Sequence, residues 1–174
     1  MVIGVFRLQR TGEAERFAGW KKANQANIGD RRLLWHGSSR GNFAGILSQG
    51  LRGDGVNPNG GSFCPGVYIA DISTKSAKYC RALPKPEVLM LLCEVELGNG
   101  NPNIGFKHIG NTTHNEWRDA GYIHSELKGV MVPDVHAGTA ITNRYLGGAL
   151  RHSEYVALNP AQVIQKYLFH IKLK

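Results

Sequence analysis

The chain has 174 residues, of which 42% are hydrophobic and 20% charged, with 22 glycines and a formal net charge of +8 at pH 7. This composition predicts a soluble globular protein with a core of its own, and so many glycines favour a loop-rich β architecture over a helical bundle. A membrane-spanning protein is excluded because no apolar run approaches about 20 residues, and the start lacks a signal-peptide pattern. An intracellular location, in cytoplasm or nucleus, is therefore expected.

Two strands and a helix are expected in the first part of the chain. Residues 2–9 alternate loosely between apolar and polar positions, which predicts a strand, and the apolar spacing over 12–23 predicts a short helix. The compact apolar run over 32–36 predicts a second strand that ends in a polar turn.

A helix and a glycine-rich loop are expected next. Asn42 is placed to cap a helix that buries Phe43 and Ile46, and Gly50 is placed to end it. Residues 53–66 are rich in glycine, contain two prolines and have few apolar anchors, which predicts a loop of the kind that often covers a ligand.

The middle of the chain predicts a strand over residues 66–70, then a helix capped by Asp71 or Ser73 that runs to about residue 82, where prolines follow. The apolar run over 88–97 predicts a central strand. Its last residues alternate with glutamates, which indicates a solvent-facing end. The polar stretch that follows, to residue 121, is expected to be mostly irregular.

Strands are expected again over residues 154–158 and 163–173, the second with alternating apolar positions. Helices fall early and strands late, without the regular alternation that a doubly wound sheet needs. The sequence therefore predicts an α+β fold. With no internal repeat and no interior linker, it predicts one domain over residues 1–174.

The cysteines, histidines and net charge limit the function classes. Cys64, Cys80 and Cys93 are odd in number and lack metal-type spacing, so reduced thiols are expected, and the scattered histidines predict no metal site. The charge of +8 favours nucleic acid, nucleotide phosphates or acidic proteins as partners. Because the basic residues are not gathered in one tract, only non-specific nucleic-acid contact is expected. The predicted protein is a monomer without membrane contact.

Two tyrosines and a serine suit the binding of a flat amide. Ser76 and Tyr79 lie three residues apart on the predicted helix and so share a face, where a hydroxyl can bind an amide and a ring can stack. Tyr68 supplies a second ring. Two rings that frame a slot suit nicotinamide, although the same residues also fit an ordinary half-exposed helix.

His36, Gly37 and Glu154 add polar groups at the ends of predicted strands. Gly37 allows a ligand to approach the backbone, and His36 can donate a hydrogen bond to a ribose hydroxyl. Glu154 precedes an apolar segment, and a carboxylate there can stabilise positive charge at a sugar's anomeric carbon. The alternatives are a structural histidine and a structural ion pair of Glu154 with Arg151 or His152.

Five stretches occur in a characteristic order. They are RLLWHGS at 32–38, NFAGILSQGLR at 42–52, GVYIAD at 66–71, KSAKYC at 75–80 and EYV at 154–156. This ordered set resembles the catalytic domain of the poly(ADP-ribose) polymerases, the His-Tyr-Glu branch of the NAD-dependent ADP-ribosyltransferases. The resemblance covers residues 2–174 and implies an ADP-ribosyltransferase fold, with split mixed or antiparallel β-sheets flanked by short helices.

The resemblance also implies roles for single residues, with NAD as co-substrate. The residues that match the family's catalytic positions are His36, Tyr68, Glu154 and Lys75, a lysine near the catalytic glutamate. The residues that match its NAD-binding positions are His36, Gly37, Ser38, Arg52, Tyr68, Ser76 and Tyr79. Of these, Gly37 and Ser76 resemble the contacts to the carboxamide, and Ser38 and Arg52 lie on the adenosine side.

The chain departs from the family at two places. Residues 60–62 are Gly-Gly-Ser where many members have an aromatic residue ahead of the position of Phe63, so a looser lid over NAD is expected. Residues 98–132 match the family's acceptor-side loop weakly, which leaves the acceptor open. If Met1 is the natural start, the chain lacks the helical regulatory domain of DNA-dependent members and is expected to turn over NAD without DNA. If it is not, that domain was removed.

The leading prediction is transfer of ADP-ribose from NAD to a protein or nucleic-acid acceptor, with nicotinamide released. The family's link to the DNA damage response goes with it. A glutamate at position 154 favours chain elongation, although addition of a single ADP-ribose stays open. Two other classes are a module that binds NAD or ADP-ribose without turnover, and a basic nucleic-acid-binding domain.

Overall fold

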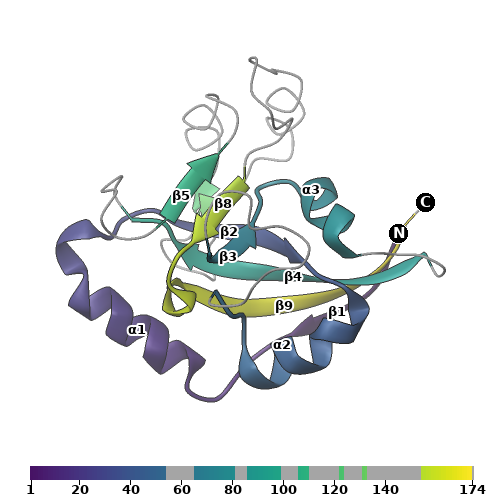
Figure 1. Cartoon of the computed structure of the whole chain (residues 1–174), viewed down its shortest axis with the longest axis horizontal. Helices are drawn as coiled ribbons and strands as arrows, with labels where there is room; N and C mark the ends of the chain where they lie inside the picture. The colour runs from purple at the N-terminus through teal and green to yellow at the C-terminus, as the bar shows by residue number, and fades with distance from the viewer. Residues whose placement is uncertain are drawn as a thin grey trace.

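A computed structural model describes residues 1–53, 65–80, 86–98, 106–109, 122–123, 131–132 and 154–173. Two sheets form its centre (Figure 1). The larger has the order β1-β9-β4-β2-β7-β6, and its strands are β1 (Val2–Arg7), β2 (Arg31–Gly37), β4 (Glu87–Glu96), β6 (Tyr122–Ile123), β7 (Met131–Val132) and β9 (Val163–Lys172). The smaller has the order β3-β8-β5, and its strands are β3 (Val67–Ile69), β5 (Phe106–Ile109) and β8 (Glu154–Ala157).

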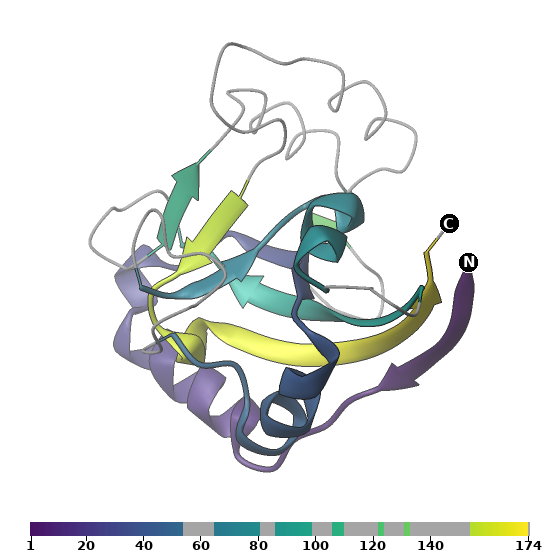
Figure 2. The ribbon, with the colours of Figure 1, turned by 45° about the vertical axis from the view of Figure 1, so that its right-hand side comes forward.

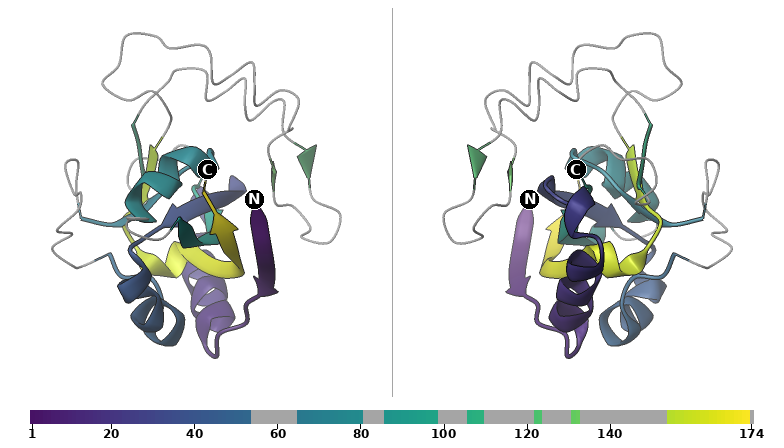
Figure 3. Two further views of the ribbon diagram at one scale, coloured as in Figure 1. Left: turned by 90° about the vertical axis from the view of Figure 1, so that its right-hand side faces the viewer. Right: turned by 90° about the vertical axis from the view of Figure 1, so that its left-hand side faces the viewer.

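In the described residues three α-helices flank the sheets, so the predicted α+β class and its division into two sheets are confirmed. Helices α1 (Glu13–Ala23) and α2 (Phe43–Gln49) lie on one side of the large sheet. The small sheet packs on the same side as α2, because Ile69 and Tyr155 share a core cluster with Phe43. Helix α3 (Ser73–Ala77) lies on the other side (Figures 1 and 3), where Ala77 packs against Val88 and Met90 of β4. All neighbouring strands are antiparallel except β2 and β7. The α2 helix ends as expected at Gly50, whose φ of 92° favours glycine.

The core lies beside the long antiparallel pair of β4 and β9. It joins residues from both sheets and from the start of α2, among them Leu34, Phe43, Leu91, Tyr155 and Val163. The first and last strands lie side by side, and the Met1 ammonium donates to the Lys172 carbonyl over 2.8 Å, so both termini are at the same end of the sheet (Figure 2).

The predicted solvent-facing end of β4 is wrong, because Glu94 and Glu96 are both buried. Glu94 pairs with the guanidinium of Arg31 and, over 2.9 Å, with the ammonium of Lys166. Glu96 Oε1 accepts three backbone N–H bonds of 3.0 Å, including those of Gly29 and Gly98. Cations and backbone donors therefore compensate these carboxylates inside the fold, where the alternation alone indicated water.

Several other expectations also differ from the structure. Helix α3 has the extended residue Ile72 at its N-cap with no side-chain cap bond, because Asp71 is itself buried. After Ala77 the chain continues as a 3₁₀ turn over Lys78–Cys80. Asn42 stands at the N-cap of α2 but donates to Ser38 Oγ over 2.9 Å. Strands β5, β6 and β7 were not expected.

Candidate functional site

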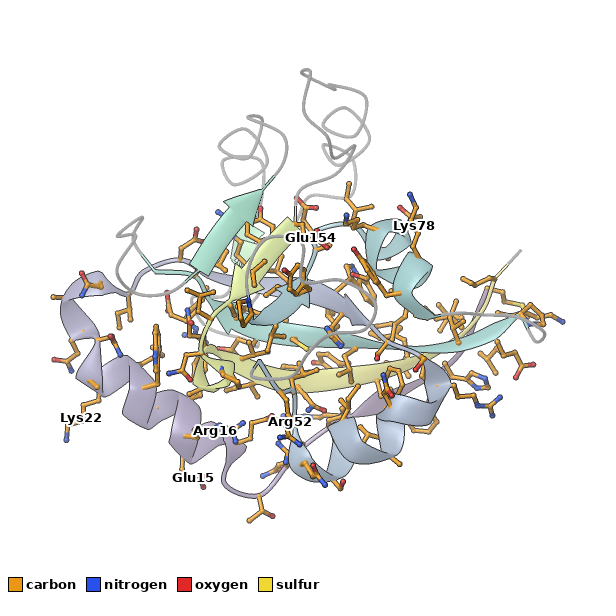
Figure 4. The ribbon with its side chains drawn as sticks, in the orientation of Figure 1. Glu15, Arg16, Lys22, Arg52, Lys78 and Glu154 are labelled. Carbon is orange, nitrogen blue, oxygen red and sulfur yellow. The ribbon has the colours of Figure 1, made fainter. Side chains whose placement is uncertain are left out.

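A cavity of about 470 Å³ opens between α2, β3, α3 and the start of β8. All of the residues that the sequence nominated, except Lys75, line it, and Lys75 contacts one of them. The nominated residues in its wall are His36, Gly37, Ser38, Arg52, Tyr68, Ser76, Tyr79 and Glu154. Segments up to 118 residues apart in sequence are thereby brought together, and Figure 4 shows Glu154 at the start of β8 on the side of α3.

The imidazole of His36 is held in one tautomer by the small sheet. Its Nδ1 lies 2.8 Å from the carbonyl oxygen of Tyr68, and a carbonyl can only accept, so Nδ1 carries the proton. Burial lowers the pKa of His36, which keeps the ring neutral near pH 7. The Nε2 lone pair is therefore an acceptor, so we expect it to accept from a ribose hydroxyl, not donate to one.

Gly37 is required by the packing of α3 on β2. A Cβ built at this position would lie 1.9 Å from the backbone oxygen of Ser76 and 3.1 Å from Cys80 Sγ. The sequence suggested that glycine admits a ligand to the backbone. The close neighbour in the structure is instead the helix, and both residues line the cavity.

We expect Gly37→Ala to destabilise the fold by about 1–3 kcal/mol, the usual cost of overpacking, because a backbone carbonyl must move. The same shift of Ser76 should weaken binding of benzamide-type compounds. Thermal unfolding and benzamide titration measure the two effects. Gly19→Ala is the matched control, since a Cβ there meets nothing within 4 Å. A Gly37→Ala protein with the parent's stability and benzamide affinity would contradict this assignment.

Ser76 and Tyr79 share a face, as expected, although Tyr79 lies in the 3₁₀ turn, where side chains three apart are eclipsed. The Ser76 hydroxyl donates to the Trp35 carbonyl over 2.9 Å, which leaves its oxygen lone pairs as acceptors toward the cavity. Burial, and next the charge of Glu154, raise the pKa of Tyr79 to about 12, so its hydroxyl stays protonated.

Glu154 is 3% exposed and is held through both of its oxygens. The Tyr79 hydroxyl donates to Oε1 over 3.1 Å, and the Lys75 ammonium lies 3.4 Å from Oε2. The ammonium is also 5.9 Å from the centre of the Tyr79 ring. One hydrogen bond and one ion pair therefore fix the carboxylate at the cavity wall. Arg151 and His152, the alternative ion-pair partners, lie outside the described residues.

Helix α2 and the 3₁₀ turn before it (Arg40–Asn42) form a wall of the cavity that sequence reasoning missed. Gly41, Asn42, Gly45, Ile46 and Gln49 all line it. Their spacing of three and four residues places them on one helix face. That periodicity is present in the sequence, but the apolar residues Phe43 and Ile46 on the same helix indicated only a core-facing stripe.

Asp71, next to α3, is a further buried acid that the sequence did not single out. It is 8% exposed, and among the described residues its Oδ1 has no hydrogen-bond partner. Burial raises its pKa to about 7, against the opposing effect of the Arg32 charge. Because the pKa is higher in the folded than in the unfolded chain, this group's contribution to stability is full below about pH 4 and is lost as the pH rises to about 7.

Asp71→Asn should remove this loss, because an amide does not ionise. We expect the melting temperature of the variant, relative to the parent, to be higher at pH 8 than at pH 5. Thermal unfolding at both pH values measures the difference. A difference that is equal at the two pH values would show that Asp71 does not titrate with a raised pKa.

In the described residues, no group of three or more His, Cys, Asp or Glu could hold a metal ion. No helix of the described part of the chain is long and apolar enough to cross a bilayer. Cys80 and Cys93 are buried free thiols. Cys64, the Gly-Gly-Ser stretch of the expected lid and most of the acceptor-side loop lie outside the described residues.

The family model for "Poly(ADP-ribose) polymerase catalytic domain" matches residues 1–173. The poly [ADP-ribose] polymerase of Drosophila melanogaster is 37% identical over 99% of this chain and 18% of its own length. Poly [ADP-ribose] polymerase 1 of Gallus gallus is 36% identical over 98% of this chain and 17% of its own length. Poly [ADP-ribose] polymerase 2-B of Oryza sativa subsp. japonica is 34% identical over 98% of this chain and 29% of its own length.

The chain spans less than a third of the length of these relatives. The matched part is nonetheless almost the whole chain, and it carries all the residues that line the cavity. Domains of the matched family use NAD+ as co-substrate. With a family model that matches residues 1–173, this chain belongs to the poly(ADP-ribose) polymerase catalytic-domain family.

Proposed function

We propose that the chain is one catalytic domain over residues 1–174 that binds NAD+ in this cavity and transfers ADP-ribose to a macromolecule, releasing nicotinamide. The observation that carries the proposal is Glu154, a buried carboxylate held by Tyr79 and Lys75 in the wall of a 470 Å³ cavity. Membership of the family supports the same reaction.

The nicotinamide ring is proposed to lie between the side chains of Tyr68 and Tyr79, both of which line the cavity. Stacking and burial favour a flat aromatic ring in such a slot. The carboxamide would bind the backbone of Gly37 and the hydroxyl oxygen of Ser76, which is free to accept because its own proton is donated to Trp35. His36, Ser38 and Arg52 would bind the remainder of the dinucleotide, with His36 Nε2 accepting from a ribose hydroxyl.

Bond cleavage places positive charge on the ribose. The bond between the nicotinamide nitrogen and ribose C1′ breaks, and its electron pair leaves with nicotinamide. The remaining sugar resembles an oxocarbenium ion, which a fixed carboxylate stabilises. Lys75 and the Tyr79 hydroxyl hold Glu154 in place before the charge develops, so little reorganisation is needed.

The acceptor then forms a bond to C1′ through a nucleophilic oxygen. A ribose hydroxyl is a weak nucleophile, and Glu154 can accept its proton as the bond forms, before releasing that proton to solvent. This role favours chain elongation and therefore a poly(ADP-ribose) polymerase. The alternatives are addition of a single ADP-ribose and binding of NAD+ without turnover. The products of the reaction distinguish them from elongation.

The acceptor is proposed to be a protein or a nucleic acid, and the catalytic chain a monomer. The net charge of +8 supports weak, non-specific contact with nucleic acid. Lys22 extends from α1 away from the sheets in Figure 4 and suits such a contact. Because surface contacts of this kind release counterions, any binding of nucleic acid should fade steeply between low and physiological salt.

Incubation of the chain with NAD+ labelled in the adenosine part tests the proposal, with products read by gel and mass spectrometry. A ladder of increasing mass supports elongation, and a single adduct of one ADP-ribose supports transfer without elongation. Free ADP-ribose alone would indicate hydrolysis. No conversion of NAD+ by folded protein at any acceptor tested would contradict the proposed activity.

A further inference from the structure

The distance between His36 and Glu154 depends on how the two sheets are held together. His36 lies on β2 of the large sheet, whereas Glu154 is the first residue of β8, which pairs with β3 and β5 in the small sheet. Both residues line the cavity. Whatever fixes the small sheet against β2 therefore also fixes the geometry of the site.

Backbone and imidazole contacts join β2 to β3. Trp35 and Ala70 exchange two backbone hydrogen bonds of 2.7 and 2.9 Å. The His36 imidazole donates to the Tyr68 carbonyl over 2.8 Å. These contacts place β3, but Glu154 lies on the next strand of the small sheet, β8.

A side-chain contact joins β2 directly to β8. Nη1 of Arg32 lies 3.5 Å from the Tyr155 hydroxyl, and the guanidinium carbon lies 5.9 Å from the centre of the Tyr155 ring. Neither residue is exposed to solvent. A buried guanidinium must be paired, and Asp30 accepts two hydrogen bonds of 2.7 Å from Arg32. The paired carboxylate fixes Arg32 in front of the ring.

The directions of the side chains show what this contact does. Successive residues of a strand face opposite sides, so Tyr155 points away from Glu154. Accordingly, Tyr155 belongs to the core cluster while Glu154 lines the cavity. Arg32 and His36 are four residues apart on β2 and share a face of that strand, and both reach the small sheet. Arg32 therefore contacts β8 on the face that bears Tyr155, which is opposite the face that bears Glu154 and borders the cavity.

We propose that Arg32 and Tyr155 are positioning residues, whose buried contact fixes β8 against β2 and thereby sets Glu154 relative to His36 and the bound ribose. The inference rests on the proposed function, in which Glu154 stabilises the ribose cation. A misplacement of about 1 Å can lower a rate by roughly 100-fold, so a loosened β8 should slow the chemical step. NAD+ binding depends on contacts from other elements and should change little.

Arg32→Met, Tyr155→Leu and the double variant test the proposal in steady-state assays of nicotinamide release. We expect kcat to fall by about tenfold or more in each single variant, with KM for NAD+ within about threefold of the parent. The double variant should be no more than about twofold worse than the poorer single variant, because both remove the same contact. Tyr155→Phe keeps the ring in front of Arg32 and should retain most of the parent kcat.

Val163→Ala is the matched control for loss of stability. Val163 is 2% exposed and belongs to the same core cluster, but it lies on β9. All variants are assayed at a temperature at which circular dichroism shows them folded. The control should lower the melting temperature and leave kcat within about twofold of the parent. A loss of kcat in Val163→Ala equal to that in Tyr155→Leu would overturn the proposal.

Glu154→Gln in the same assay separates this proposal from the proposed function. Full activity of that variant would overturn the proposed function itself. If Glu154→Gln is inactive, while Arg32→Met and Tyr155→Leu are folded and keep the parent kcat, only the positioning role is overturned. If Arg32→Met does not fold, Tyr155→Leu and Tyr155→Phe decide: both at the parent kcat overturns the proposal, and a loss in Tyr155→Leu alone supports it.

Discussion

Glu154→Gln is expected to lower the rate of ADP-ribose transfer by about 100-fold or more, the usual scale for a positioned electrostatic or acid–base group. The amide keeps the size of the side chain but loses the charge that stabilises the ribose cation. It can still accept from the Tyr79 hydroxyl, so the cavity should keep its shape and its affinity for NAD+. Elongation should suffer most, because it needs proton removal from a ribose hydroxyl.

Glu94→Gln is the matched control, because Glu94 is also buried and paired with cations, but on β4 and outside the cavity wall. It should lower the melting temperature and leave transfer per folded molecule unchanged. NAD+ affinity, measured by calorimetry, should be similar in all three proteins. Equal transfer rates in Glu154→Gln and the parent would remove Glu154 from the mechanism.

Tyr79→Ala is expected to weaken binding of 3-aminobenzamide by about 1–3 kcal/mol, which corresponds to roughly 5- to 150-fold in the dissociation constant. The ring is one side of the proposed nicotinamide slot, and its removal takes away stacking and burial. Ser76→Ala should weaken binding less, by about 0.5–1.5 kcal/mol, because it removes one hydrogen-bond acceptor. Calorimetric titration measures both losses.

Tyr79→Phe separates the two roles of this side chain. It keeps the ring but cannot donate to Glu154 Oε1, so benzamide affinity should stay close to the parent while transfer slows. If millimolar 3-aminobenzamide gives no thermal shift with the parent protein, or if Tyr79→Ala binds it as well as the parent, the assignment of the slot is wrong.

The nominated residues that line the cavity could be singled out from the sequence because each lies in a short motif whose neighbours define it. Gly37 follows His36 on one strand, and Ser76 and Tyr79 are three apart on one helical segment. The partners of Glu154 were harder to find. Tyr79 is 75 residues away in sequence, and its hydroxyl reaches the carboxylate only because α3 and β8 border the same cavity.

The missed elements depend on long-range pairing. Strand β5 contains only four residues, and its partner β8 begins 45 residues later in the chain, so no local pattern marks it as a strand. The glutamates at the end of β4 led to the wrong prediction of a solvent-facing end for a related reason. Alternation of charged and apolar residues indicates water only when no cation approaches, and Lys166 reaches Glu94 from the neighbouring strand β9.

The most direct test is a count of products from NAD+ labelled separately in its nicotinamide and adenosine parts, with the parent chain and Glu154→Gln side by side. We predict that the parent releases nicotinamide in an amount equal to the ADP-ribose attached to macromolecules plus any free ADP-ribose. Glu154→Gln should bind NAD+ and release about 100-fold less nicotinamide in the same time. Parent protein that binds NAD+ and returns it intact, or equal nicotinamide release by the two proteins, would contradict a catalytic role for this cavity.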